Sequence, residues 1–401
     1  MFGRRVTVWL MLAVAVFGSA TAQSVKAYYP GTIKPNYISQ QQLDKQIANF
    51  YGQWKAKFVK GVSDRAEKYI WFQNKGGKQC VSEGQGYGMM IIALMAARDA
   101  GAHNAFDDLF RYARSHPSRR SKYLMAWAQR TDGADLDKTS ATDGDLDIAY
   151  ALLLADKQWG SGGAINYLEQ AKNTINAAMQ YEINHKTWSV LLSDAVEYDS
   201  KDYYATRSSD FMPSHFKDFA KTTNDKRWLK VVDAGYKLFE EMQRQYSPDA
   251  GLIADFIVNL NHHPKPAKPY FLESKYDGAY NYNACRVPWR IGVDYLINGD
   301  SRARRVDDKI NRWIRTTTRN NTYNLSAGYS LEGNDLPSRY FEALSFVAPF
   351  AVSATVDKGN QQWLNDIWRY LTGFKLKDYD YYDNSIKLLD MIIISGKYPA
   401  L

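Results

Sequence analysis

The chain has 401 residues, of which 45% are hydrophobic, and a formal net charge of +8 at pH 7. That charge is spread without a long basic run, which argues against nucleic-acid binding. The two cysteines, Cys80 and Cys285, have no CxxC spacing, so a disulfide framework and a cysteine metal site are excluded, whereas pairing of these two remains open.

The N-terminal residues 1–22 have the pattern of a signal peptide. Arg4 and Arg5 form the charged start, residues 6–17 the apolar run, and the small residues ATA at 20–22 the cleavage site. Its removal takes away two arginines and no acid, so the net charge falls from +8 to +6. No later stretch is apolar for long enough to cross a membrane. We expect a secreted or periplasmic protein.

The remainder of the chain is dominated by a helical period. Apolar residues recur at three- and four-residue spacing in twelve segments, near 41–59, 84–100, 104–116, 143–157, 163–182, 211–222, 226–247, 283–298, 301–317, 337–354, 358–372 and 381–396. Because no repeat of 34 or 40 residues occurs, an open solenoid is disfavoured. A closed toroid of six helix pairs uses the same number of helices. We expect one domain over 23–401.

The long predicted loops carry many of the Asp, Glu, Trp and Tyr residues, as expected of functional loops on a rigid scaffold. They are 60–83, 117–142, 185–210, 248–282 and 318–336. Short strands are expected within 185–210 and 318–332. The 11 Trp and 29 Tyr suit a sugar-binding surface, because flat rings stack on pyranose faces, although core packing explains them equally well.

A first acidic motif is SEGQGYGM at 82–89. Ser82 is a candidate N-cap, which places Glu83 in the first turn of a helix. The glycines keep bulk away from this carboxylate, which would let a substrate approach the backbone. Alternatively, Glu83 is only a first-turn acid favoured by the helix dipole. The motif is neither a phosphate loop nor a dinucleotide fingerprint.

A second acidic motif is TDGDLDIAY at 142–150, where Thr142 or Asp143 could cap a helix. The helix dipole explains one acid here but not three. At this spacing Asp143 and Asp147 share a helix face, and Asp145 points elsewhere. A calcium loop is excluded because the bidentate Glu is missing.

The third motif, 270–290, combines two acids, Glu273 and Asp277, with four tyrosines, one tryptophan and two arginines at a loop-to-helix junction. An ordinary aromatic loop is the alternative. The two histidines at 262–263 are expected in a solvated loop, and no Gly-x-Ser-x-Gly pattern occurs. Hydrolysis by a Ser-His-Asp triad is therefore disfavoured. Separated carboxylates lined by aromatics suit hydrolysis of a glycosidic bond, which needs one acid and one base and no metal or cofactor.

The motifs resemble those of glycoside hydrolase family 8. The resemblance rests on SEGQGYGM, on ATDGDLDIAY (141–150) followed by KQWGS (157–161), on RVPWRIG (286–292), on DFMP (210–213) and on LMAW (124–127). It implies an all-α (α/α)6 barrel with an open groove. It further implies an inverting endo-hydrolase of β-1,4-linked polysaccharide, such as cellulose, mixed-linkage β-glucan, chitosan or xylan.

The resemblance also assigns roles to residues. Glu83 would be the general acid, and Asp143 would hold and distort the sugar at the cleavage subsite. The other residues expected to bind substrate are Trp127, Tyr282, Asn283, Arg286, Asp145 and Tyr87.

One departure from the family pattern concerns the general base. Many members read YDACR where this chain reads YNACR, and Asn283 cannot usefully take a proton from water. A similar subgroup, with chitosanase and licheninase members, takes its base from a Glu just upstream, which Glu273 matches. Asp277 is the second choice, and a non-catalytic sugar-binding protein that lost its base is a further alternative.

Charge bears on two further expectations, the protonation states of Glu83 and Glu273 and the choice of substrate. Glu83 must stay protonated, which Asp143 nearby would favour, and Glu273 must stay ionised, so it should be exposed or near Arg or Lys. The net charge of the mature chain leans against polycationic chitosan, although three acids at 143–147 could reverse this locally. We therefore expect a monomeric endo-glucanase acting on β-1,4- or mixed-linkage β-glucan, with chitosan as the alternative substrate.

Overall fold

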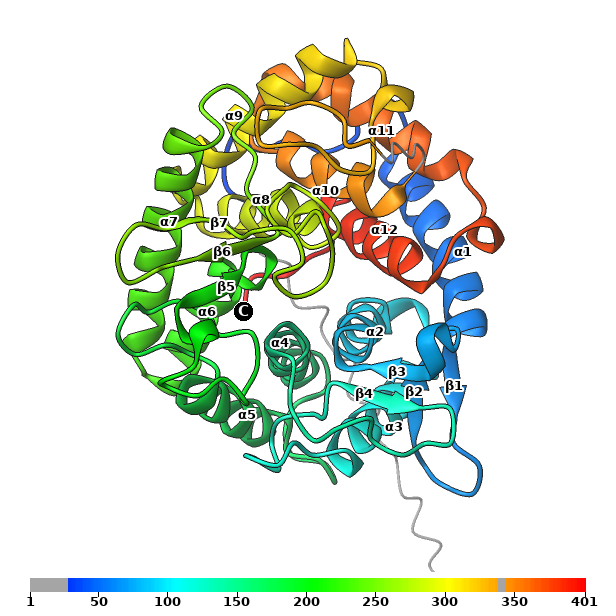
Figure 1. The fold of residues 1–401 in the computed structure, drawn as a ribbon. Coiled ribbons are helices and arrows are strands. Elements are labelled where there is room, and N and C mark those ends of the chain that lie inside the picture. The colour runs from blue at the N-terminus through cyan, green and yellow to red at the C-terminus, as the bar shows by residue number, and fades with distance from the viewer. Residues whose placement is uncertain (1–27, 338–342) are drawn as a thin grey trace, which may run out of the picture.

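The computed structural model describes residues 28–337 and 343–401 of the chain, and these residues hold twelve α-helices in two concentric rings. Inner and outer helices alternate along the chain (Figure 1). The inner helices are α2 (Ser82–Leu94), α4 (Thr142–Trp159), α6 (Pro213–Thr223), α8 (Val287–Asn298), α10 (Leu344–Ala354) and α12 (Tyr381–Ile394). The outer helices are α1 (Gln40–Phe58), α3 (Ala102–Ser115), α5 (Tyr167–Tyr181), α7 (Arg227–Gln245), α9 (Ser301–Thr318) and α11 (Gln361–Gly373).

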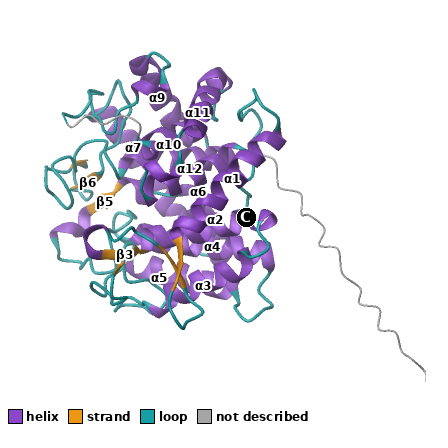
Figure 2. Ribbon diagram, turned by 90° about the vertical axis from the view of Figure 1, so that its right-hand side faces the viewer, coloured by secondary structure: helices purple, strands orange, loops and turns teal. Residues whose placement is uncertain are grey.

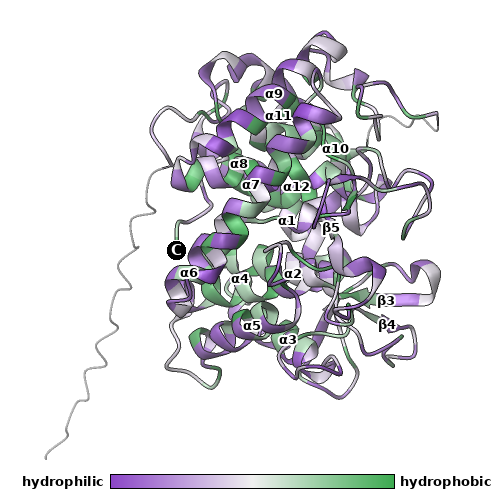
Figure 3. Cartoon of the chain, turned by 60° about the vertical axis from the view of Figure 1, so that its left-hand side comes forward, coloured by the Kyte–Doolittle hydropathy of each residue, from purple (hydrophilic) through white to green (hydrophobic). Residues whose placement is uncertain are grey.

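The two rings follow from the hydropathy of the segments. Every residue of α10 is buried, and α2, α4, α8 and α12 are buried over most of their lengths. The outer helices bury one stripe and expose charged residues, which Figure 3 shows as green inner and purple outer ribbons. Each inner helix packs on the outer helix of its pair, and α12 packs on α2, which joins the ends of the inner ring. The fold is an (α/α)6 barrel, as predicted.

The described residues also form three small antiparallel sheets, and the strands labelled in Figure 2 lie toward its left side. They pair β1 (Val59–Gly61) with β2 (Lys68–Ile70), β3 (Lys78–Val81) with β4 (Ala128–Arg130), and β5 (Ala205–Arg207) with β6 (Phe256–Val258), which also pairs with β7 (Lys265–Pro266). Strand β3 leads directly into α2, and β5 precedes α6, so the strands fix where these inner helices begin.

Several expectations from the sequence need correction. The strand expected in 318–332 is absent among the described residues of that segment, where Tyr329 makes only single bridges. Helices α2 and α4 begin after Val81 and Ala141, whose side chains cannot accept a hydrogen bond, so Ser82 and Thr142 are first helical residues rather than caps. The predicted start of the tenth helix and the predicted leader 1–22 lie partly or wholly outside the described residues.

Two further findings complete the fold. Cys80 and Cys285 are both free and buried, which answers the question of their pairing. Among the described residues, no helix combines the length and the apolar character needed to cross a membrane.

Candidate active site

The candidate site is a cleft of about 690 Å³ at which inner helices α2, α4 and α12 begin. Glu83, Asp143, Glu273, Trp127, Tyr282 and Asn283 all line it. These six residues come from five separate segments of the sequence, and all six were predicted as site residues. The carboxylates lie on two walls, which differ in structure.

On the first wall, close contact between α2 and α4 brings Glu83 and Asp143 together. A Cβ atom added to Gly144 would lie 2.4 Å from Oγ of Ser82, and one added to Gly86 would lie 2.8 Å from Cβ of Asp147. Only glycine allows this approach. The expectation that these glycines open the backbone to substrate is therefore corrected for Gly86, which serves helix packing and sets the spacing of the two acids.

Arg286 joins the two acids of this wall. Its Nη1 donates hydrogen bonds to Oε2 of Glu83 at 2.8 Å and to Oδ2 of Asp143 at 2.9 Å. The guanidinium is 1% exposed and also donates to the hydroxyl of Tyr87 at 3.0 Å. On its other side, Glu83 accepts a hydrogen bond at Oε1 from the hydroxyl of Tyr381, the first residue of α12. Glu83, in α2, is thus held by side chains from two other segments, the turn before α8 and the start of α12.

The two acids of this wall have opposite pKa shifts. Burial raises the pKa of Glu83 to about 7, and the Asp143 carboxylate acts in the same direction. Arg286 and the hydrogen bond from Tyr381 act to lower this pKa. Burial also acts to raise the pKa of Asp143, but Arg207 and Arg286 together hold it below its usual value. Near neutral pH, a substantial fraction of Glu83 therefore keeps its proton, while the neighbouring Asp143 is ionised.

The second wall carries Glu273, whose side chain is 44% exposed. Its Oε1 accepts a hydrogen bond from Nη2 of Arg207 at 3.0 Å, and its Oε2 accepts one from Nδ2 of Asn283 at 2.8 Å. The side-chain oxygen Oδ1 of Asn283 accepts a hydrogen bond from Nη2 of Arg286 at 3.0 Å. The amide of Asn283 therefore connects the two walls, with its donor facing a carboxylate and its acceptor facing a guanidinium.

Two buried carboxylates shape the loops of the second wall. Asp277 accepts hydrogen bonds from the backbone N–H groups of Leu272, Glu273 and Ser274 at 2.7–3.0 Å. Asp255, which precedes β6, accepts from the N–H groups of Asn281, Asn283 and Ala284 at 2.7–3.2 Å. Asp277 is fully buried, so it positions the loop that presents Glu273 and does not itself reach the cleft.

Aromatic side chains line the cleft around the acids. Tyr282 is 45% exposed and rests edge-on against Phe346, with ring centres 5.0 Å apart. Trp127 donates from Nε1 to Asp137 at 2.8 Å, which fixes its indole plane. Flat rings held in this way suit stacking against pyranose units.

Three residues expected to bind substrate do not line the cleft: Arg286, described above, and Asp145 and Tyr87. Asp145 is fully buried and accepts the backbone N–H of Met125 at 2.8 Å. Tyr87 is also fully buried, and its hydroxyl meets Arg286. Asp147 faces away from the cleft and pairs with Arg290 at 2.5 Å. The shared helix face predicted for Asp143 and Asp147 therefore does not bring both into the site, because α4 is buried on all sides.

The sequence did not single out Arg207 and Tyr381. Arg207 lies three residues before the DFMP motif and Tyr381 in the run DYDYYD at a helix start, which are weak signals for a site. Their partners are 66 and 298 residues away, so only the folded chain reveals them. Within the described ranges, no group of three or more His, Cys, Asp or Glu side chains could hold a metal ion.

Comparisons with known proteins identify the family and the fold. The family "Glycosyl hydrolases family 8" matches residues 32–396. A "Beta-glucanase" of Niallia circulans is 43% identical over 376 residues, covering 92% of this chain and 89% of that protein. An "Endoglucanase" of Bacillus sp. (strain KSM-330) is 39% identical over 394 residues, covering 95% and 83%. The solved apo structure of a "Beta-1,3-1,4-glucanase" from Paenibacillus sp. X4 superposes with a TM-score of 0.90 at 41% identity, covering 94% of this chain and 97% of that one.

Proposed function

Because the chain belongs to the glycosyl hydrolases family 8, we propose that it is an endo-β-glucanase that cleaves internal β-1,4 linkages of β-glucan with inversion. The observation that carries this proposal is the pairing, in one cleft, of a Glu83 whose pKa is raised to about 7 with an exposed Glu273 held by Arg207 and Asn283. The names of the similar proteins supply the substrate class.

In this proposal, Glu83 is the general acid. Its proton passes to the glycosidic oxygen as the bond from that oxygen to the anomeric carbon breaks, so the leaving sugar departs as a neutral alcohol. Burial keeps the proton on Glu83 near neutral pH, and Arg286 then stabilises the carboxylate that remains. The ionised Asp143 beside it would stabilise positive charge that develops on the sugar ring.

Glu273 is the proposed general base. A water molecule attacks the anomeric carbon from the face opposite the leaving oxygen, and Glu273 accepts its proton. Exposure to the cleft gives this carboxylate access to water, and Arg207 holds it in place through a hydrogen bond. Asn283 then orients the base instead of acting as one, which accounts for the amide at this position.

Chitosan is a second candidate substrate, which the charge of the cleft supports. Six acids line the cleft, against three bases. The acids are Glu83, Asp143, Glu273, Asp378, Asp380 and Asp383, and the bases are Lys75, Lys78 and Arg207. Lys75 pairs with Asp380, which leaves an acidic excess that would attract a polycation.

We also propose that residues 1–22 direct export and that residues 23–401 act as one monomeric catalytic domain. The pattern of Arg4 and Arg5 before an apolar run supports the first point. An endo-acting enzyme in the cytosol would not meet polymeric β-glucan, so export fits the proposed substrate. Size-exclusion chromatography with light scattering would test the monomer, and N-terminal sequencing of the exported protein would test the cleavage site.

The deciding experiment measures reducing-end release by the purified protein on carboxymethylcellulose, lichenan, chitosan and xylan in parallel, with Glu83→Gln as the blank. We expect release from the two β-glucans and none in the blank. Release from chitosan alone would retain the mechanism and overturn the glucan assignment. No release from any polymer would contradict the hydrolase proposal. NMR of the first anomer formed from lichenan should show inversion.

A further inference from the structure

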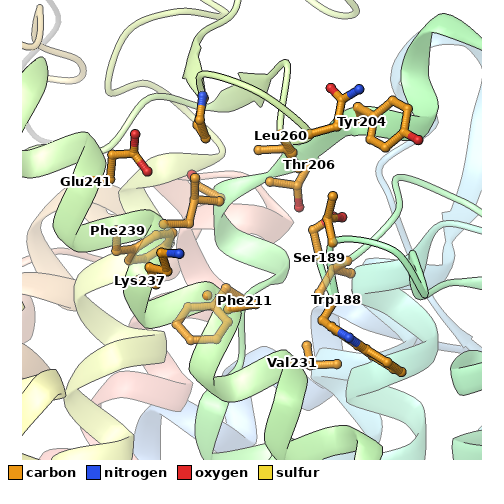
Figure 4. Close-up of a pocket in the computed structure, with 18 of the residues that line it drawn as sticks. Trp188, Ser189, Tyr204, Thr206, Phe211, Val231, Lys237, Phe239, Glu241 and Leu260 are labelled. Atoms are coloured by element: carbon orange, nitrogen blue, oxygen red, sulfur yellow. The ribbon is translucent and has the colours of Figure 1, made fainter.

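A second cavity, of about 500 Å³, lies beside the candidate active site, and strand β5 contributes residues to it. Its lining comes from the segment 186–190, from β5, from α7 and from the turn after β6. In Figure 4, Lys237, Phe239 and Glu241 of α7 lie opposite Trp188, Ser189 and Thr206, with Phe211 and Val231 at the bottom of the view. The volume falls within the roughly 300–1,000 Å³ of small-molecule sites.

The lining of the cavity has an apolar part and a polar part. Phe211, Val231 and Phe239 belong to the apolar part, here called the floor, and Ser189, Thr206 and Asn261 belong to the polar part, here called the rim. A ligand that fits must combine an apolar face with hydrogen-bonding groups around its edge.

The charges of the lining favour a neutral ligand. Lys237 and Glu241 lie one turn apart on α7 and offset each other, and Lys186 is engaged with the ring and hydroxyl of Tyr198. The charge of Arg207 is directed to Asp210 and Glu273. Few unpaired charges therefore remain to hold an anion or a cation.

The backbone of Trp188 adds an independent observation. Trp188 lies on the cavity wall with a φ of 57°, in the left-handed region that bulky residues rarely adopt. Backbone strain of this kind is concentrated at ligand sites, where the surrounding structure holds it in place. Here His185 stacks on the indole with ring centres 5.5 Å apart, and Nζ of Lys230 lies 4.7 Å from its centre.

We propose that this cavity is a second, non-catalytic saccharide site that takes one or two glucosyl units. A pyranose ring has an apolar face and a rim of neutral hydroxyls, which matches the floor and rim described above. The choice of glucosyl units rests on the proposed function, because hydrolysis of β-glucan releases such fragments next to the cavity.

The cavity is connected to the proposed base through β5 and β6. Arg207 lines both the cavity and the cleft, and it donates to Glu273 at 3.0 Å. The next residue, Ser208, lines the cavity and bonds through its N–H to the carbonyl of Asp255 at 3.0 Å, and the Asp255 carboxylate holds the N–H of Asn283 at 3.2 Å. A ligand that shifts β5 would therefore act on both residues that hold Glu273.

The test is region-resolved hydrogen–deuterium exchange of the whole protein carrying Glu83→Gln, with and without cellobiose at tens of millimolar. We expect cellobiose to slow exchange in the cavity segments 186–190 and 256–264 as well as around the cleft. Ala234→Trp, which fills the cavity from the half-buried side of α7, should abolish protection of the cavity segments only. Glu240→Trp, at an exposed position of the same helix outside the cavity, is the matched control.

The outcomes separate this inference from the proposed function. Protection confined to the cleft segments in every variant would overturn the second site. A second variant, Asn261→Ala, removes a rim amide without adding bulk and should weaken the cavity protection if Ala234→Trp fails to fold. Protection of the cavity in a protein without activity on β-glucan would support the site and overturn the proposed function. Activity on β-glucan without protection of the cavity segments would support the proposed function and overturn the second site.

Discussion

The two walls of the cleft present carboxylates in different ways. Glu83 and Asp143 lie in the first turns of two inner helices, with side chains 18% and 6% exposed, and one buried guanidinium ties them together. Glu273 lies on a loop between β7 and α8, is 44% exposed, and is held by side chains that reach it from β5 and from the turn before α8.

This difference matches what the two proposed roles require. A general acid needs desolvation to retain its proton near neutral pH, and rigid helix starts supply it. A general base needs contact with water, which an exposed loop supplies, and Arg207 holds this carboxylate through a hydrogen bond. The helix starts of the barrel therefore position the proposed acid, and the loop positions the proposed base. Each wall can be tested separately.

The largest effect is expected on the helical wall. Glu83→Gln removes the transferable proton and leaves the packing of α2 unchanged, so kcat should fall at the upper end of the roughly 10²–10⁴-fold range for general acid catalysis. Steady-state hydrolysis of lichenan measures it. Glu169→Gln, also in the first turn of its helix, is the matched control and should keep full activity. Equal loss in both variants would contradict a specific role for Glu83.

A smaller loss is expected on the loop wall. Glu273→Ala should lower kcat by about 10²–10³-fold, since water can still reach the anomeric carbon without its base. Azide, a small anionic nucleophile that needs no deprotonation, should restore turnover of a glycosyl fluoride in this variant.

Asp277→Asn separates the two candidate bases. Asp277 accepts three backbone N–H groups, so its loss should disturb the loop and raise KM, and azide should not restore activity. Rescue of Asp277→Asn and not of Glu273→Ala would assign the base to Asp277.

The helical wall was largely predictable from the sequence, and the loop wall was not. Apolar periodicity located all twelve helices within a few residues, apart from the end of the second and the start of the tenth, because inner and outer helices both need apolar faces to pack. A first-turn carboxylate on an inner helix must then lie at a barrel end, which placed Glu83 and Asp143. The spacing alone could not show that Gly86 and Gly144 set the contact between α2 and α4.

Both walls also depend on contacts between distant segments. Arg207 reaches Glu273 from 66 residues upstream, and Tyr381 reaches Glu83 from 298 residues downstream. No local pattern encodes such pairs, so the sequence predicted that Glu273 should be exposed or near Arg or Lys, but not which residue would contact it. Asp145 was misplaced for a related reason: acids in a motif look alike until burial separates those in the cleft from those behind it.

The amide of Asn283 provides a way to disturb both walls at once. Asn283→Ala removes its hydrogen bonds to Glu273 and to Arg286. Hydrogen bonds to charged groups contribute about 1.5–3 kcal/mol each, but water can replace part of this in an open cleft. We therefore expect a loss of about 10-fold in kcat/KM on lichenan. Asn283→Asp places a carboxylate against Glu273 and should lose more; a gain of activity there would show that this position can still supply the base.

The smallest effect expected is a displacement of the pH profile by Tyr381→Phe. Tyr381 donates a hydrogen bond to Glu83, which lowers the pKa of Glu83, whereas burial raises it to about 7. Loss of the hydroxyl leaves the carboxylate less stabilised, so the pKa should rise and the alkaline limb of kcat/KM should move to higher pH. Asp143→Asn removes a charge that raises the same pKa, so its residual activity should show the limb at lower pH. Opposite displacements in the two variants would assign the alkaline limb to Glu83. A titrating group on the loop wall should not shift in opposite directions in these two variants.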